Sequence, residues 1–140
     1  MTLRTNATLL KQRYTNPVVG LKSKYWAKKT EIDWIKFASQ LEGRFYSFFI
    51  EREIPIISLQ PRYILQESFR YNGELIRAIE YRADFIIEWK GKEIIIEAKG
   101  METPEWKIKK KLWIKRYWDG NILLVAKSIK SLSEQLLLMK

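Results

Sequence analysis

Apolar residues recur at helical spacing in three parts of the chain, and two of these begin with residues that favour a helix start. Ser39 and Glu42 form a capping box, in which a hydroxyl residue is followed three positions later by an acid. Thr103 and Pro104 combine a cap residue with proline at the first helical position. The predicted helices cover residues 39–53, 103–118 and 131–140.

Apolar runs and period-two alternation predict four strands, at residues 56–65, 75–89, 92–99 and 122–126. Asn72-Gly73 is a strong turn signal, Lys90-Gly91 separates two of the strands, and Pro61 indicates an edge or a bulge. Residues 32–38 form a short strand or an extended lead-in. The order of elements predicts one α/β domain over residues 31–140, with a mixed β-sheet of about four strands flanked by helices.

A two-residue turn at Lys90-Gly91 fixes the register of the hairpin around it. In this register Asp84 lies opposite Glu97, and Arg82 lies opposite Lys99. The other face of the hairpin is wholly apolar and therefore belongs to the core. Its predicted pairs are Ala83 with Ala98, Phe85 with Ile96, and Ile87 with Ile94. A longer turn would shift this register.

Composition narrows the chemistry that such a domain can perform. The 140 residues include no cysteine and no histidine, which excludes disulfides, zinc fingers, thiol nucleophiles and histidine acid–base catalysis. A catalytic metal would therefore be held by oxygen ligands, which favour Mg²⁺, Mn²⁺ or Ca²⁺. The formal net charge of +10 indicates a polyanionic partner.

The predicted Asp84–Glu97 pair is the most informative feature of the hairpin. Carboxylates facing each other across strands lie roughly 5 Å apart and repel by about 3 kcal/mol at an effective dielectric constant near 20. A divalent cation between Asp84 and Glu97 would turn this repulsion into binding. The alternative is that Arg82 and Lys99 neutralise the pair as an exposed ion cluster.

Basic residues gather in two further segments. Residues 1–30, which include Lys28 and Lys29, contain no acid and form either a solvated tail or an arm that grips nucleic acid. Lys107, Lys111 and Lys115 recur every four residues and form a stripe along the second predicted helix. This stripe is either a solvated helix face or a surface that follows the phosphate backbone of DNA. The candidate DNA-binding residues are Lys28, Lys29, Arg82, Lys107, Lys110, Lys111 and Lys115.

Asp84, followed twelve residues later by Glu97-Ala98-Lys99, resembles the D…(D/E)xK signature of the PD-(D/E)XK nuclease superfamily. Four further stretches resemble a phage-encoded branch akin to Holliday junction resolvases and transposon end-cleaving endonucleases. They are Phe37-Ala38-Ser39 with Leu41-Glu42, Leu59-Gln60-Pro61, Ile79 to Phe85, and Glu97 to Gly100. The resemblance covers about residues 30–118. Trp34 stands where that family usually has glycine.

The resemblance implies a restriction-endonuclease-like core, with Mg²⁺, or Mn²⁺ as a substitute, at the hairpin. Asp84, Glu97 and the backbone carbonyl of Ala98 would bind the metal, and Glu42 would hold a second metal through water. Lys99 would orient the attacking water or stabilise developing charge. The implied catalytic residues are Glu42, Gln60, Asp84, Glu97 and Lys99.

Glu42 and Gln60 also have purely structural alternatives. Glu42 is the third residue of the capping box, and Gln60 could make a hydrogen bond at a sheet edge instead of positioning water or phosphate.

The resemblance further implies a Mg²⁺-dependent endonuclease that cuts four-way or other branched DNA junctions in phage recombination or replication. Two symmetric cuts favour a homodimer. The alternatives are a flap, single-strand or nicking nuclease, or a DNA-binding protein without catalysis. Apolar stretches are far shorter than a membrane span, and no secretory signal is found, so we expect no membrane partner and a cytoplasmic location, that of the host cell if the chain is phage-encoded.

Overall fold

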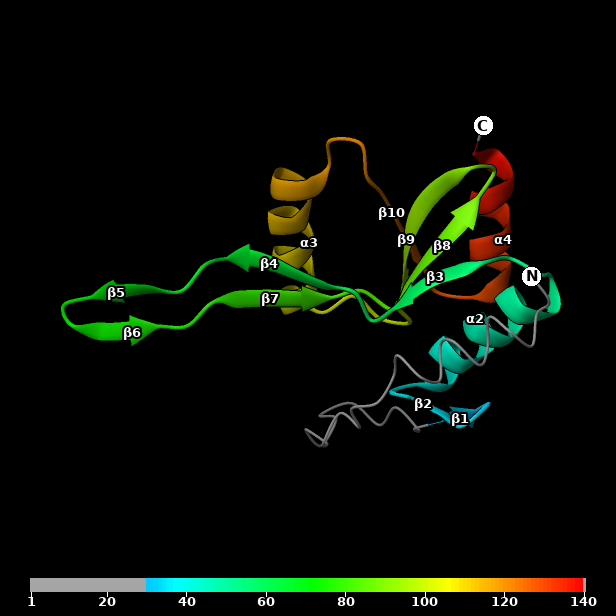
Figure 1. Ribbon diagram of the computed structural model, residues 1–140, viewed down its shortest axis with the longest axis horizontal. Helices are drawn as coiled ribbons and strands as arrows, with labels where there is room; N and C mark the ends of the chain where they lie inside the picture. The colour runs from blue at the N-terminus through cyan, green and yellow to red at the C-terminus, as the bar shows by residue number, and fades with distance from the viewer. Residues whose placement is uncertain (1–29, 140) are drawn as a thin grey trace.

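The structure is a computed structural model that describes residues 30–139, so Lys28, Lys29 and the rest of the predicted basic segment before Thr30 lie outside the described residues. The described chain is a mixed α/β fold with three helices and several small sheets (Figure 1). Among these residues, no helix is both long and apolar enough to cross a membrane.

A mixed four-stranded sheet organises the body of the molecule. Its strands are β3 (Ile56–Leu59), β8 (Phe85–Trp89), β9 (Lys92–Ala98) and β10 (Ile122–Ala126), arranged in the order β10-β9-β8-β3. β10 runs parallel to β9, while β8 is antiparallel to both β9 and β3. The predicted mixed sheet of about four strands is therefore confirmed, and β10 has the predicted bounds.

Three helices flank this sheet, namely α2 (Gln40–Glu51), α3 (Pro104–Tyr117) and α4 (Ile129–Leu138). The predicted caps are correct for the first two, because the side chains of Ser39 and Thr103 accept hydrogen bonds from backbone N–H groups in the first turn. α4 starts two residues before its predicted start.

Two apolar clusters lie on the two faces of the sheet. The first contains the aromatic residues of α2, two buried leucines of α4, and the sheet face that carries Phe85, Ile87, Ile94 and Ile96, all four of which are fully buried. The second joins α3 to the opposite face through residues such as Ile95. The predicted apolar hairpin face is thus core, and the face that bears Glu97 is partly covered by α3.

Residues 30–37 form a hairpin rather than the predicted short strand or lead-in. β1 (Thr30–Ile32) pairs with β2 (Ile35–Phe37) through a turn at Asp33 and Trp34, both of which have positive φ. Such two-residue turns usually carry Asn-Gly or Asp-Gly, so the Asp-Trp sequence hid this hairpin.

A two-stranded arm leaves the body beside α3 and projects well beyond it (Figure 1). Its base is the pair β4 (Arg62–Gln66) and β7 (Ile79–Arg82), and its tip is the pair β5 (Phe69–Tyr71) and β6 (Glu74–Ile76). The tip turns at Asn72-Gly73, both with positive φ, as predicted.

The arm corrects two predicted strands. Residues 56–65 are divided at Gln60-Pro61, where Gln60 has a φ of 50°. Residues 75–89 are divided into β6, β7 and β8, because the chain changes its pairing partner from β5 to β4 and then to β9. Apolar alternation continues across these changes, so it cannot reveal where one partner replaces another.

Candidate metal centre

The register of the β8–β9 hairpin is the predicted one. Phe85 lies opposite Ile96, and the backbone N–H of Asp84, just before β8, donates to the carbonyl oxygen of Ile96 at 3.2 Å. The Asp84 carboxylate accepts a hydrogen bond from the backbone N–H of Ala98 at 2.7 Å. Asp84 and Glu97 are therefore brought together, as the hairpin register predicts.

Arg82 does not lie opposite Lys99, contrary to the expected register. It belongs to β7 and pairs with Arg62 of β4, and its charge acts on Glu80. The alternative in which Arg82 and Lys99 together neutralise the acids as an exposed ion cluster is therefore wrong. Of these two residues, Lys99 lies beside the pair, with its Nζ 3.8 Å from Oε1 of Glu97.

Glu97 is buried in the wall of the site and only 5% exposed. Its Oε2 accepts a hydrogen bond of 2.6 Å from the hydroxyl of Tyr81, which is itself buried. The side chain of Asp84 lies close enough to influence its pKa. Sequence reasoning missed Tyr81, although it stands within the stretch from Ile79 to Phe85 that carries the nuclease resemblance.

Burial raises the pKa of both carboxyl groups. The pKa of Glu97 rises from 4.5 to about 7, mainly through loss of solvation. The pKa of Asp84 is raised well above its usual range, first by loss of solvation and then by the charges of Glu97 and Glu42. Without a cation, these groups therefore keep protons at pH values where exposed Asp and Glu have lost theirs.

Glu42 reaches the same centre from the first turn of α2, although it is distant in sequence. It is 9% exposed, burial raises its pKa, and its charge in turn raises the pKa values of Asp84 and Glu97. Its backbone N–H also donates to Oγ of Ser39, and its carboxylate accepts from the same hydroxyl, each at 3.1 Å. Glu42 thus has the capping role and a place in the acidic cluster at once.

Lys99 is the cation of the cluster. Its charge lowers the pKa values of Glu42, Asp84 and Glu97, which partly offsets the effect of burial. Its Nζ lies 5.1 Å from the centre of the Trp106 ring, at the start of α3. The first turn of α3 therefore helps to hold this lysine beside the acids.

Gln60 adjoins the centre through its backbone. Its N–H donates to the carbonyl oxygen of Asp84 at 3.0 Å, and the N–H of Ala83 donates to the carbonyl oxygen of Pro61 at 3.1 Å. These two bonds hold the segment between β3 and β4 against Ala83 and Asp84. These backbone bonds do not depend on the glutamine side chain, so both roles considered for it stay predictions.

The donor set suits a hard divalent cation. Asp84 and Glu97 each have one oxygen in a short hydrogen bond, to Ala98 and to Tyr81, which leaves the other oxygen for a ligand. A strand residue points its N–H and C=O to the same side, so the Ala98 carbonyl faces the side of Asp84. Oxygen donors of these kinds bind Mg²⁺ and Mn²⁺. Within residues 30–139, no three acidic side chains form a ready metal site, so Glu42 is not a third direct ligand in this arrangement.

A family model described as "Protein of unknown function (DUF1064)" matches residues 22–133 of the chain. The chain belongs to this family. The match includes the whole acidic centre, α3 and the arm. No curated protein and no solved structure matches the chain. The DUF1064 description assigns no activity, so the nuclease resemblance stays a prediction.

The predicted lysine stripe of this DUF1064 protein lies on the outer side of α3. Lys107, Lys111 and Lys115 are exposed, whereas Trp106 and Trp113 on the other side of the helix are buried. Two other predicted DNA-binding residues are also accessible, since Arg82 is exposed and Lys110 is half-buried. The positively charged helix α3 begins only five residues after Lys99.

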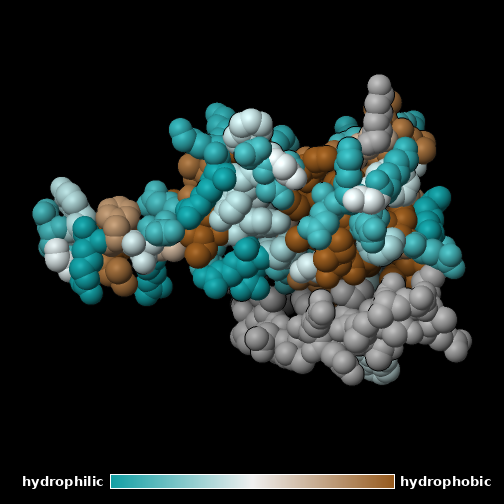
Figure 2. All heavy atoms as spheres, turned by 45° about the horizontal axis from the view of Figure 1, so that its top comes forward, coloured by the Kyte–Doolittle hydropathy of each residue, from teal (hydrophilic) through white to brown (hydrophobic). Residues whose placement is uncertain are grey.

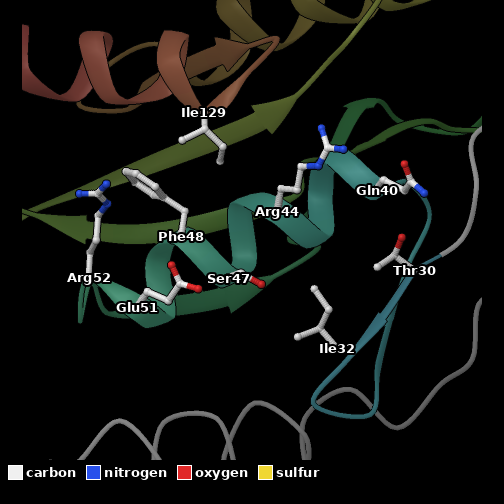
Figure 3. A pocket seen from close by; sticks show the side chains of 9 residues that line it. All are labelled: Thr30, Ile32, Gln40, Arg44, Ser47, Phe48, Glu51, Arg52 and Ile129. Carbon is white, nitrogen blue, oxygen red and sulfur yellow. The ribbon is translucent and has the colours of Figure 1, made fainter.

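A separate cavity of about 560 Å³ lies against α2 (Figure 3). Its wall is formed by β1, by the outer side of α2 and by Ile129 at the start of α4. The DUF1064 acidic centre does not line it. The lining residues are Thr30, Ile32, Gln40, Arg44, Ser47, Phe48, Glu51, Arg52 and Ile129.

Proposed function

We propose that this DUF1064 protein is a Mg²⁺-dependent DNA endonuclease with a restriction-endonuclease-like core. The observation that carries the proposal is the adjacent pair of half-buried Asp84 and buried Glu97 with Lys99 beside it, in the spacing that resembles the PD-(D/E)XK signature. Burying two acids against each other destabilises a fold, and a stable chain could avoid this with one Asn or Gln. A cation that binds between them explains why both remain acids.

In this mechanism each residue has a defined task. Asp84, Glu97 and the Ala98 carbonyl would hold Mg²⁺, which when bound would polarise the scissile phosphate and lower the pKa of the attacking water. Lys99 orients that water or stabilises the negative charge that develops on the phosphate. Tyr81 holds the Glu97 carboxylate in place through its hydroxyl.

Glu42 and Gln60 serve at the margin of the same centre. Glu42 holds a second metal through water, in keeping with its electrostatic influence on both ligands and its lack of a direct three-acid site. Gln60 positions water or phosphate beside Asp84. The lysines of α3 follow the phosphate backbone of the DNA.

The substrate proposed is a four-way or other branched DNA junction in phage recombination or replication, in the cytoplasm of the host. Two symmetric cuts require two active sites, so two copies of the chain act together. A flap, single-strand or nicking nuclease would use the same residues. A panel of labelled four-way junction, flap, duplex and single strand with Mg²⁺ at fixed salt separates these substrates.

The decisive test combines metal binding with cleavage. We expect Mg²⁺ to raise the melting temperature of the protein through linkage and Asp84→Asn to abolish both this rise and cleavage. Glu88→Gln is the matched control, since Glu88 is an exposed acid on the adjacent strand β8. Wild-type cutting by Asp84→Asn would overturn the metal assignment.

Lys99→Met separates catalysis from metal binding. Methionine keeps an apolar stem against Trp106 but removes the charge. We expect cleavage to fall by at least about 100-fold, while the Mg²⁺-dependent rise in melting temperature remains. Equal cleavage by Lys99→Met and the wild type would exclude the catalytic role of this lysine.

A DNA-binding protein without catalysis is the second candidate, and the exposed lysine stripe on α3 favours it. It does not account for the buried acids. Tight DNA binding that is insensitive to EDTA, with no nicked product and no Mg²⁺-dependent change in melting temperature, would support this candidate instead.

A further inference from the structure

The tip of the arm exposes large apolar side chains far from either core cluster. Phe69 is 47% exposed, Tyr71 is 64% exposed and Leu75 is 53% exposed. Apolar spheres also lie between hydrophilic ones on the arm in the space-filling view (Figure 2). Exposed apolar side chains that cluster in this way mark interaction sites more often than scattered ones do.

The register of the tip separates these side chains onto two faces. Phe69 pairs with Ile76 and Tyr71 pairs with Glu74, so these four residues lie on one side of the hairpin. Leu75 pairs with Arg70 on the opposite side. We name the side that carries Phe69, Tyr71 and Ile76 the aromatic face of the arm.

The tip also lacks two of the features that keep such a hairpin apart from other chains, namely lysine and proline at its edges. An uncovered two-stranded hairpin is only marginally stable in water. β5 and β6 have no other strand neighbour in the described part of the chain, so each has a free edge. Residues 66–79 contain no lysine and no proline, the residues that commonly protect free edges.

Charge distinguishes between the kinds of partner that could cover this face. Residues 66–79 contain two arginines, Arg70 and Arg77, and two glutamates, Glu67 and Glu74, so their charges balance. Helix α3, in contrast, has six basic side chains and one acid. Surfaces that bind DNA are strongly positive, whereas balanced charge allows two identical copies to approach without repulsion.

We infer that the aromatic face of the arm binds the same face of a second copy of this chain, about a twofold axis. An isologous contact buries Phe69 and Tyr71 of both copies at once. The inference rests on the proposed function only for its expectation of two copies, and it can be tested without any cleavage. One hairpin from each copy buries less than the roughly 800 Å² per partner of a standard interface, so the dimer should dissociate in the micromolar range.

The test is the solution mass of the full chain by analytical ultracentrifugation from about 1 to 100 µM, a range chosen to span micromolar dissociation. We expect the wild type to move towards twice 16.8 kDa with rising concentration, and Phe69→Ser/Tyr71→Ser to stay monomeric. Leu75→Ser is the matched control, because Leu75 is exposed to a similar degree on the opposite face. It should dimerise as the wild type does.

Three results would overturn the inference. The first is a wild type that stays monomeric at the highest concentration, and the second is a double variant that dimerises as the wild type does. The third is a Leu75→Ser variant that weakens the dimer as much as the double variant does. A double variant that keeps the wild-type mass but loses DNA binding would assign the aromatic face to DNA instead. An unchanged Mg²⁺-dependent rise in melting temperature shows that the body of the double variant is folded. It also separates the two proposals, because the interface can then fail while the metal centre is intact.

Cross-linking tests the same contact without removing an aromatic side chain. Because the chain has no cysteine, Glu74→Cys places a single thiol on the aromatic face, and Leu75→Cys places one on the other side. We expect a short bismaleimide to give a yield of cross-linked dimer at least about tenfold higher for Glu74→Cys than for Leu75→Cys, since only position 74 faces the partner copy. Equal yields would contradict the inference.

Discussion

The acidic centre and the tip of the arm both depart from the ordinary distribution of side chains, in opposite directions. In the centre, Glu42 and Glu97 are acids with less than a tenth of their surface exposed. In the tip, Phe69 and Tyr71 are aromatic residues with about half or more of theirs exposed. Buried charge and clustered exposed apolar surface are the two observations that carry information beyond the usual rule of burial.

The difference between the two regions lies in what each requires to become stable. The centre contains three carboxyl groups and one lysine, so it favours added positive charge, whether from protons or from the proposed cation. The tip has balanced charge and uncovered apolar surface, so it requires another apolar surface. Each region therefore indicates a different kind of partner, and one pattern of substitutions can test both.

The largest expected effect is on the pH dependence of stability. The pKa of Glu97 rises from 4.5 to about 7 on folding, so between these values the folded state holds a proton that the unfolded state has lost. The free energy of unfolding of the metal-free protein should therefore fall by up to about 3 kcal/mol as pH rises from 4.5 to above 7.

Urea unfolding in EDTA at pH 5 and pH 8 measures this change. Glu97→Gln removes one of the three acids whose pKa is raised and should make the dependence weaker, whereas Glu88→Gln, on an exposed position of β8, should leave it as in the wild type. A wild-type protein that is more stable at pH 8 than at pH 5 would show that the ionised carboxylates of the centre do not destabilise the fold. The centre would then not need a charged partner, and its contrast with the arm would be lost.

The next effect concerns the positioning of Glu97. Tyr81→Phe keeps the ring against Trp106 but removes the hydroxyl that donates to Oε2 of Glu97. Loss of such an outer partner of a metal ligand typically costs 10- to 100-fold in metal affinity or activity, and we expect a loss of about this size. Mg²⁺ titration of the melting temperature and cleavage rates measure it. Tyr63→Phe is the control, because the Tyr63 ring stacks on Tyr81 without a hydrogen bond to Glu97. Equal losses in both variants would show that the loss does not come from the hydrogen bond to Glu97.

The smallest effect is expected at the tip of the arm. Tyr71→Ser should change the free energy of unfolding of the dilute monomer by less than about 0.5 kcal/mol, because its side chain is mostly exposed. Urea unfolding below about 1 µM, where a micromolar dimer is dissociated, measures this change. A loss of several kcal/mol would show that Tyr71 packs within its own chain, and the tip would then resemble the core rather than contrast with it.

The fold was predictable where local chemistry decides it. Turn residues at Lys90-Gly91 and Asn72-Gly73 placed two hairpins, and the hydroxyl caps placed the starts of α2 and α3. The division of residues 75–89 into three strands was not predictable, because alternation reports which face is buried and not which strand is the neighbour. The β1–β2 turn was hidden because Trp34 adopts a positive φ that usually requires glycine.

The candidate centre was predictable for the same reason. A correct hairpin register was enough to place Asp84 beside Glu97. The contribution of Tyr81 depends on how β7 leaves the hairpin, and the nearness of Glu42 depends on how α2 packs, so neither follows from spacing along the chain. Arg82 was misplaced because the register was continued beyond the residue at which β8 begins.

The crossing at residues 83–84 joins the arm to the body. β7 ends at Arg82 and β8 begins at Phe85. Between them, backbone hydrogen bonds join Ala83 and Asp84 to Pro61 and Gln60, which connect β3 to β4. Asp84, the proposed metal ligand, is thus located at the base of the arm, between β7 and β8. If the proposed partner at the tip changes the direction of the arm, Asp84 would move with it, and the proposed partner and metal binding would then change each other's affinity by the same factor.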